Sequence, residues 1–397
     1  MRDLVIKKLR ALIVSWIHTS FTFPQGLCDI VIWFIRGRDS TVIIRLFSKK
    51  FGHFLMNTES FLIDREARIE GRKVIYFLDK LPYDNNQMKE IWAEIITVQP
   101  YGRMIAWLWL SKWSSKIEVV SYPITWSQSG LLLDKEFGDT NFYRAVKQKA
   151  EYWEDLNLDS NRPLITITVR HSSYQAAALS GSLQSWRDND LSVVNNVVDS
   201  LDADGFQVVL ANYISDPSVK KELSKKLLIR DFSLVQQARL FESSVLVLCG
   251  ATGVDWIPVM QGRPAVLYNW QLGTSFPSVI VRSKSIVVPQ RVFSISSDRF
   301  VTLKEYSQLL QHIEIKYSID RLEETVQLAT GVRTVHPNAK EILDAVGRLR
   351  KWILDDSEIG PKAISDSWKG YPRIWNHMNR PWIAFDKSKL RSYLQYQ

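Results

Sequence analysis

Between residues 245 and 270 the chain alternates apolar runs with a turn of small residues. Residues 245–248 form a continuous apolar run, which is typical of a parallel strand buried on both faces. The turn CGATG (249–253) predicts a close approach of the backbone to a ligand and a helix start whose amides favour an anion. Gly262 is placed to close that helix in a left-handed conformation, before a second apolar run. The pattern predicts a strand–helix–strand unit, and a tight turn without a ligand is the alternative.

The same alternation of strand and helix patterns occurs in both halves of the chain. Apolar runs predict strands over 41–50, 72–80, 116–123, 163–170 and 206–212. Helical spacing of apolar residues is found over 88–98, 101–113, 140–153, 191–201 and 233–241. The polar segment 156–163, which ends in proline, predicts a linker between the halves. The pattern indicates the α/β class, with two doubly wound, Rossmann-like domains facing a cleft.

The composition indicates where the protein resides and which kinds of site it lacks. The chain has 397 residues, 46% of them hydrophobic, which suffices for two globular domains and excludes a disordered protein. Its two cysteines, Cys28 and Cys249, lie in separate apolar runs, so neither a disulfide nor a thiolate metal site is expected. The six histidines show no metal-binding spacing, and the sequence contains no P-loop. We expect a cytoplasmic protein that needs no metal and no bound cofactor.

The net charge of +9 is concentrated at the start of the chain. Residues 1–50 carry nine Lys and Arg against three Asp, and apolar residues alternate with the basic positions at nearly helical spacing. The apolar patches fall short of the ~20 residues that span a bilayer, and no signal-peptide cleavage site is evident. We expect residues 1–38 to lie as amphipathic helices on the anionic inner face of the plasma membrane.

This basic segment has two other interpretations. A helical arm packed on the protein's own core would need no membrane. Nucleic acid is not an expected partner, because no RNA-binding signature accompanies the charge.

Ligands of open α/β sheets bind beyond the carboxyl ends of the strands, and this rule selects loops in both halves. The loop after the first predicted strand contains His53, whose titration near neutral pH suits a general base. Glu59 is a second catalytic candidate in the same loop. The alternative for His53 is that its imidazole only caps a backbone group. The residues expected on the acceptor side of this loop are Lys50, Gly52 and Asn57.

In the second half, Arg170 ends a predicted strand, and a guanidinium suits a diphosphate because it can pair with the oxygens bidentately. Asp255 is either a catalytic group or a residue that only caps a helix start, where an acidic side chain is favoured in any case. Asp188 or Asn189 is expected to be the N-cap of the helix that begins near residue 191.

Several segments occur in the order seen in one protein family. They are FGHFLMNTESFL, TVRHSSY, SWRDNDLSVVNNVVDSLDADGFQVV, the unit from Gly250 to Asn269, and IVVPQRVFS followed by RFVTLKEYSQ. Over roughly residues 42–352 the chain resembles a family of bacterial glycosyltransferases encoded among surface-polysaccharide genes, itself similar to enzymes of the two-domain glycosyltransferase-B fold. The family's Arg-Asp-Ser-x-Tyr motif falls on residues 170–174, with His171 in place of the acidic member. Its Tyr-Arg-Asn motif falls on residues 186–188, where only Arg187 is kept.

The resemblance implies transfer of a sugar from a nucleotide-sugar donor to a glycan or lipid-linked acceptor, without a bound metal. The residues expected to bind the donor are Arg170, Ser172, Ser173, Tyr174, Arg187, Asn212, Gly250, Thr252, Gly253 and Asn269. The catalytic candidates are His53, Glu59 and Asp255. A nucleotide-sugar epimerase and a non-catalytic glycan-binding or scaffold relative are the alternative hypotheses.

Four regions are expected along the chain. Residues 1–40 form the basic amphipathic arm, and residues 41–158 form an N-terminal α/β domain on the acceptor side. Residues 159–355 form a C-terminal α/β domain that binds the nucleotide-sugar. Residues 356–397 form an aromatic tail that packs back on the protein.

Overall fold

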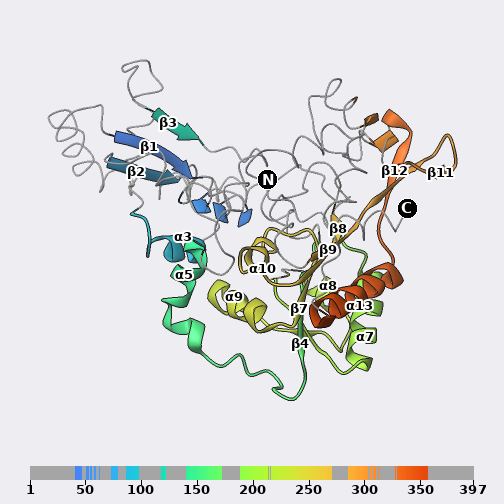
Figure 1. Cartoon of the computed structure of the whole chain (residues 1–397), viewed down its shortest axis with the longest axis horizontal. Helices are drawn as coiled ribbons and strands as arrows, with labels where there is room; N and C mark the ends of the chain where they lie inside the picture. Colours follow the sequence, from blue (N-terminus) through green and yellow to red (C-terminus); the bar gives the residue numbers. More distant parts are fainter. Residues whose placement is uncertain are drawn as a thin grey trace, which may run out of the picture. The chain divides into compact units, whose positions relative to one another are not determined.

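The computed structural model of the chain divides into two units (Figure 1). One comprises Met1–Leu132 and Arg144–Val146, and the other comprises Leu133–Tyr143 and Lys147–Gln397. The described residues are 41–46, 51–52, 54–55, 58–59, 62, 73–78, 86–97, 118–121, 140–171, 188–212, 214, 216–270, 285–302, 305–306, 308–309, 312, 327 and 329–355. The expected arm (1–40) and aromatic tail (356–397) lie outside these residues, so both stay predictions, as do the expected domain boundaries.

The first unit contains a parallel sheet of three strands, β1 (Thr41–Leu46), β2 (Lys73–Leu78) and β3 (Glu118–Ser121). β1 lies in the centre and pairs with both neighbours. All three strands lie where apolar runs predicted them. Helix α3 (Asn86–Trp92) buries Met88, Ile91 and Trp92, whose spacing places them on one helical face. The helix predicted over 88–98 is thus present but ends at Trp92.

A short helical segment follows before the second sheet. It consists of α5 (Asn141–Lys147) and the 3-10 helix η3 (Ala150–Trp153). The single helix predicted over 140–153 is interrupted because Lys149 is extended, with φ −77° and ψ 132°. η3 packs on α9 (Leu234–Ser243), where Arg239 Nη1 donates to the carbonyl of Tyr152 at 2.9 Å.

The second unit is built on a parallel sheet of six strands. They are β4 (Leu164–Ile167), β5 (Gln207–Leu210), β6 (Leu228–Ile229), β7 (Leu246–Cys249), β8 (Ala265–Trp270) and β9 (Ser285–Pro289). Their order is β6-β5-β4-β7-β8-β9, so the chain runs outward from β4 to β6 and then returns to the middle at β7. This is the doubly wound order, and its direction reverses between β4 and β7. The predicted α/β class with a doubly wound parallel sheet is confirmed.

Helices cover both faces of this sheet. α7 (Leu191–Ala203) and α13 (Ala339–Asp355) lie side by side (Figure 1), and α13 contacts β8 and β9. α9 contacts β4 and α10 (Trp256–Met260). Alternate residues of β4 divide between the faces: Ile165 and Ile167 pack in one apolar cluster with α7 and α13, whereas the hydroxyl of Thr166 meets that of Ser244 after α9.

The local sequence explains where these helices begin and end. α7 buries Val194, Val197, Val198 and Leu201, at the spacing of one helical face. The left-handed conformation expected at Gly262 is confirmed, with φ 64° after α10, and Gly205 after α7 adopts φ 87°.

Membrane crossing needs a long apolar helix, and none of the helices in the described part of the chain meets that requirement.

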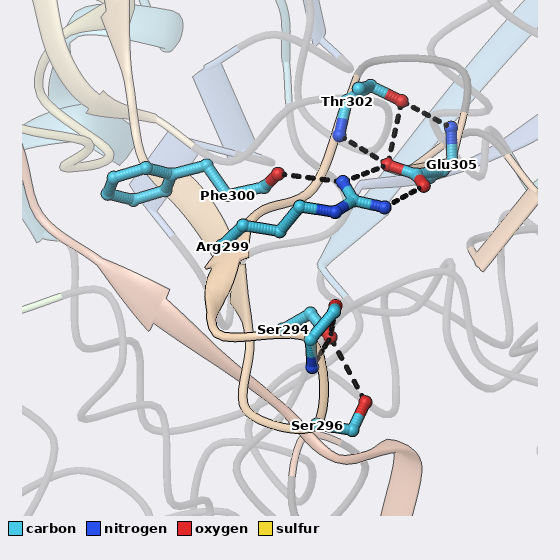
Figure 2. A network of polar contacts seen from close by, with 7 residues as sticks. Ser294, Ser296, Arg299, Phe300, Thr302 and Glu305 are labelled. Atoms are coloured by element: carbon cyan, nitrogen blue, oxygen red, sulfur yellow. Dashed lines mark hydrogen bonds and ion pairs between the residues drawn. The ribbon is translucent and has the colours of Figure 1, made fainter.

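The second unit also contains an antiparallel sheet of three strands, β10 (Arg291–Ser294), β11 (Arg299–Phe300) and β12 (Val332–Val335), with β10 in the centre. Figure 2 shows the polar contacts around β11. Thr302 and Glu305 cap each other: the Glu305 amide donates to Thr302 Oγ1 at 3.3 Å, and the Thr302 amide donates to Glu305 Oε2 at 2.8 Å. Arg299 adds two hydrogen bonds to the same carboxylate, at 2.9 and 2.5 Å. Because these side chains are largely exposed, the network orders a loop without adding much stability.

Gly250, directly after β7, lies where a side chain has no room. A Cβ there would be 2.4 Å from the Thr168 carbonyl oxygen, 2.5 Å from Asn189 Oδ1 and 2.8 Å from the Tyr268 hydroxyl. Glycine is therefore needed at this position for packing between strands, whether or not a ligand approaches it.

We predict that Gly250→Ala lowers the free energy of unfolding by about 1–3 kcal/mol, the usual cost of overpacking. Gly347→Ala is the matched control, because a Cβ at Gly347 in α13 would meet nothing within 4 Å. That change should stabilise the protein by up to about 1 kcal/mol through helix propensity. Urea denaturation midpoints measure both, and equal midpoints for the two variants would contradict the packing described for Gly250.

Candidate functional site

The carboxyl ends of β4 and β7 are joined by a buried hydrogen-bonded network. Just beyond β4, the Thr168 hydroxyl accepts from the Gly250 amide at 2.8 Å and donates to Asp255 Oδ1 at 2.5 Å. The Thr168 carbonyl accepts from the Tyr268 hydroxyl at 2.6 Å. Burial raises the pKa of Tyr268 well above its usual value, so this hydroxyl keeps its proton. The ends of β4, β7 and β8 are therefore fixed relative to one another at the switch point.

Asp255 is the centre of this network and is fully buried. Besides Thr168, the Thr252 amide donates to its carboxylate at 2.7 Å and the Thr252 hydroxyl at 2.8 Å. A buried carboxylate with three donors is satisfied by the protein itself. Of the two interpretations that the sequence left open, the geometry favours a structural residue that closes the turn before α10. Asp255 presents no surface to a substrate.

The turn after β7 leaves two backbone amides for a ligand. Ala251 adopts φ 63°, a left-handed conformation that is uncommon for a residue with a side chain. The Thr252 amide and hydroxyl, which we expected to contact phosphate, both donate to Asp255. The amides of Gly253 and Val254 donate to no residue that the structure describes. Because α10 has only 5 residues, the turn supplies the donors and the helix dipole expected here adds little.

Arg170 lies three residues beyond the end of β4, beside this turn. Its side chain is only 14% exposed, Nη1 lies 3.5 Å from the Ala251 carbonyl oxygen, and Nε lies 3.9 Å from Asp188 Oδ1. Its amide donates to Asn189 Oδ1 at 2.6 Å, and its carbonyl accepts from the Asn189 amide at 2.9 Å. The structure thus brings Arg170 next to the turn after β7, beside a carboxylate that offsets part of its charge.

A carboxylate of the protein itself caps the N-terminus of α7. Asp190 is the N-cap, and not Asp188 or Asn189 as we expected; its Oδ1 accepts from the Ser192 amide at 2.9 Å and from the Ser192 hydroxyl at 2.7 Å. The hydroxyl contact is the main cause of a lowered pKa of Asp190. In dinucleotide-binding folds the corresponding helix start receives a phosphate. Here that place is taken, so the turn after β7 is the better position for an anionic ligand.

Asn269, near the end of β8, connects this edge to the segment before α7. It adopts φ 62° at an irregularity in the pairing of β8 with β9, and it is 2% exposed. Nδ2 donates to the Asp188 carbonyl at 3.1 Å. Oδ1 accepts from Gln290 Nε2 at 2.9 Å and lies 2.5 Å from His336 Nδ1. The side chain expected to contact the donor therefore binds three groups of the protein.

Asn212, after β5, has a similar structural role. Its Oδ1 accepts from the Val169 amide at 2.7 Å, and its Nδ2 donates to the Val169 carbonyl at 2.8 Å. The side chain thereby continues the pairing of β4 with β5 by one further residue. Burial raises the pKa of the Cys249 thiol, at the end of β7, well above its usual value, so this thiol stays protonated and is unsuited to nucleophilic chemistry.

Several expected site residues fall elsewhere. Glu59 is fully buried and Gly52 is half-buried in the first unit. The residues that lie outside the described part of the chain, and whose roles stay predictions, are Lys50, His53, Asn57, Ser172, Ser173, Tyr174 and Arg187. Within the ranges that the structure describes, no group of three or more His, Cys, Asp or Glu is placed to hold a metal ion.

Sequence reasoning missed three residues at this edge of the sheet: Thr168, Tyr268 and His336. The first two had a signal, since each is a polar residue near the carboxyl end of an otherwise apolar strand. His336 had none, because the residue that it contacts, Asn269, is 67 positions away.

Comparisons with known proteins found similar structures but no similar sequences. No family model matches the chain, and no curated protein matches its sequence. It is similar to a glycosyl transferase family 9 protein from Veillonella parvula, with 11% identity, 80% of this chain and 98% of that chain covered, and a TM-score of 0.44. For ADP-heptose LPS heptosyltransferase II from E. coli the values are 12%, 80%, 100% and 0.45. For UDP-GlcNAc 2-epimerase from Methanocaldococcus jannaschii they are 14%, 83%, 81% and 0.31. The fold assignment therefore rests on the strand order and helix contacts of the chain itself.

Two substitutions separate the structural and the catalytic interpretation of Asp255. Asp255→Ala removes the acceptor of three buried or half-buried donors, so we predict a loss of about 1–3 kcal/mol in the free energy of unfolding. Asp255→Asn should cost much less, because a rotated amide can accept from the Thr252 amide and donate to both threonine hydroxyls. Chemical denaturation measures both. An Asp255→Ala variant as stable as the wild type would contradict the structural role.

Proposed function

We propose that this protein is a glycosyltransferase that transfers a sugar from a nucleotide-sugar to a glycan or lipid-linked acceptor of surface polysaccharide. The observation that carries the proposal is the turn at residues 250–254. It lies beside the switch point of a doubly wound sheet, and there the amides of Gly253 and Val254 donate to no described residue and the Arg170 guanidinium lies close by. Backbone amides and a guanidinium at this place suit the diphosphate of a nucleotide-sugar.

The chemistry required of these groups is to stabilise a leaving group. In the transfer, the bond between the anomeric carbon and the diphosphate oxygen breaks, and the acceptor hydroxyl oxygen bonds to the same carbon. Negative charge grows on the departing nucleoside diphosphate, and fixed donors aimed at that charge lower the barrier. The acceptor proton passes to a base, for which His53 is the residue predicted from the sequence. The described groups can act on the diphosphate without a metal, which is why we propose a metal-independent reaction.

Two observations favour a sugar-nucleotide over the other common ligands of such sheets. The turn lacks the lysine of a P-loop, which ATP sites use. Asp190 closes the helix start on which NAD-binding folds place their pyrophosphate. Both the transferase and the alternative epimerase fit a sugar-nucleotide, and transfer that depends on added acceptor distinguishes them.

The ion pair of Arg170 with Asp188 bears on the non-catalytic alternative. The Asp188 carboxylate, 3.9 Å from Arg170 Nε, weakens the electrostatic attraction of Arg170 for an anion. A relative that binds glycan without catalysing a transfer would tolerate this weaker attraction.

The proposal also concerns where the enzyme acts: residues 1–38 attach it to the anionic inner face of the plasma membrane, and the protein is cytoplasmic. Vesicle sedimentation of the full chain and of a chain lacking residues 1–38 tests that part.

Arg170→Ala tests the proposed donor site. We predict that the wild type binds at least one of UDP, ADP or GDP, and that the variant binds it about 10–100-fold more weakly, because a charge-assisted hydrogen bond contributes about 1.5–3 kcal/mol. Isothermal titration calorimetry measures the affinities.

Arg162→Ala serves as the control. Arg162 precedes β4 at the opposite end of the sheet and pairs with Asp202 at 2.7 Å, so its loss affects stability and should leave nucleotide affinity unchanged. If no nucleotide binds the wild type, or if Arg170→Ala binds as well as the wild type, the proposed donor site is contradicted.

A further inference from the structure

His336 lies between β12 and α13 and contacts the buried side chain of Asn269. The imidazole is half-buried, and its Nδ1 lies 2.5 Å from Asn269 Oδ1. No role was expected for this histidine from the sequence. Its contact reaches the same polar cluster that includes Asp188, which pairs with Arg170 at the candidate site.

The contacts of Asn269 determine which nitrogen of His336 carries the proton. Asn269 Nδ2 donates to the Asp188 carbonyl, so its Oδ1 is the oxygen that faces His336 and Gln290. Because an amide oxygen only accepts, His336 Nδ1 must donate. Burial lowers the pKa of His336, and Asp190 and Asp188 oppose that shift. The neutral imidazole is therefore held as the tautomer with the proton on Nδ1.

This hydrogen bond supports a strained part of the sheet edge. Asn269 is held at φ 62° where the pairing of β8 with β9 is irregular. Asparagine tolerates this conformation better than most residues, but the conformation persists only where the surroundings hold it. The surroundings here are His336, Gln290 and the carbonyl of Asp188.

We propose that His336 is a positioning residue of the donor site: it holds Asn269, Asn269 holds the backbone of Asp188, and the Asp188 carboxylate places the Arg170 guanidinium beside the turn after β7. The relay consists of two hydrogen bonds, 2.5 Å from His336 to Asn269 and 3.1 Å from Asn269 to the Asp188 carbonyl. Its last contact is the ion pair between Asp188 and Arg170, which at 3.9 Å is longer than a hydrogen bond. The part of the inference that concerns nucleotide affinity rests on the proposed function. The positioning of Arg170 does not.

The charges around His336 are compatible with this role. Asp188 and Asp190, from the segment before α7, are the carboxylates that act on the imidazole. Glu341, in the first turn of α13, is paired with Arg291 of β10 at 3.3 Å. Protonation of His336 would add a donor at Nε2 and leave the Nδ1 donor in place, so the relay itself does not require one particular pH.

Two variants of His336 test the relay. His336→Ala removes the Nδ1 donor, whereas the amide nitrogen of His336→Asn can take the place of Nδ1. In ¹⁵N-labelled full-length protein we expect the wild-type imidazole to be protonated at Nδ1, and the Arg170 Nε–H resonance to shift in His336→Ala and to keep its wild-type position in His336→Asn. With UDP, ADP and GDP as probes, we expect the dissociation constant of the nucleotide that binds to rise about 5–10-fold in His336→Ala and by less than about twofold in His336→Asn. The effect is modest because the lost hydrogen bond acts on Arg170 only through Asn269 and Asp188.

The outcomes separate this inference from the proposed function. An imidazole protonated at Nε2, an Arg170 resonance unmoved in His336→Ala, or an asparagine variant that behaves like the alanine variant overturns the positioning role. If none of these nucleotides binds the wild type, the link to affinity fails together with the proposed function. The Arg170 resonance still decides in that case whether His336 positions the guanidinium.

Discussion

The contact between Thr168 and Asp255 constrains the edge of the six-stranded sheet more than any other interaction. Thr168 directly follows β4, and its side chain and carbonyl bind Gly250 after β7 and Tyr268 in β8; Asp255 is the buried anion that organises these contacts. A buried carboxylate is tolerated only when its hydrogen bonds are made inside the protein, so the positions of Thr252 and of the turn follow from it. Position 250 must be glycine for the same reason, because the Thr168 carbonyl oxygen occupies the space that a side chain would need.

Two left-handed residues, Ala251 and Asn269, lie at the ends of the neighbouring strands β7 and β8. Such conformations cost of order 1–3 kcal/mol each and persist where the surrounding contacts determine them. Ala251 directs its carbonyl toward Arg170, and Asn269 ties β8 to the backbone of Asp188. The strain is thus located where the proposed site needs fixed donors. Preorganised amides and a held guanidinium suit a transfer reaction, because the protein need not reorganise as charge develops on the leaving group.

Most helices and strands could be predicted from the sequence, whereas most contacts between them could not. Buried strands were predictable because both faces of a parallel sheet are covered, which leaves uninterrupted apolar runs such as 245–248. α7 was predictable from its apolar spacing, and Gly262 from its place after a helix. The N-cap Asp190 was missed because three adjacent polar residues can each cap, and only the backbone path decides among them. The roles of Asp255 and Asn212 depend on partners 87 and 43 positions away, a separation that no local pattern encodes.

We propose that the turn at residues 250–254 binds a diphosphate beside Arg170. A crystal structure with a bound nucleoside diphosphate tests it most directly, because it places the phosphorus atoms among named donors. We expect phosphate oxygens about 3 Å from the amides of Gly253 and Val254, with the Arg170 guanidinium turned toward them. A nucleotide bound with its phosphates at the start of α7, or away from the carboxyl edge of the sheet, would contradict it.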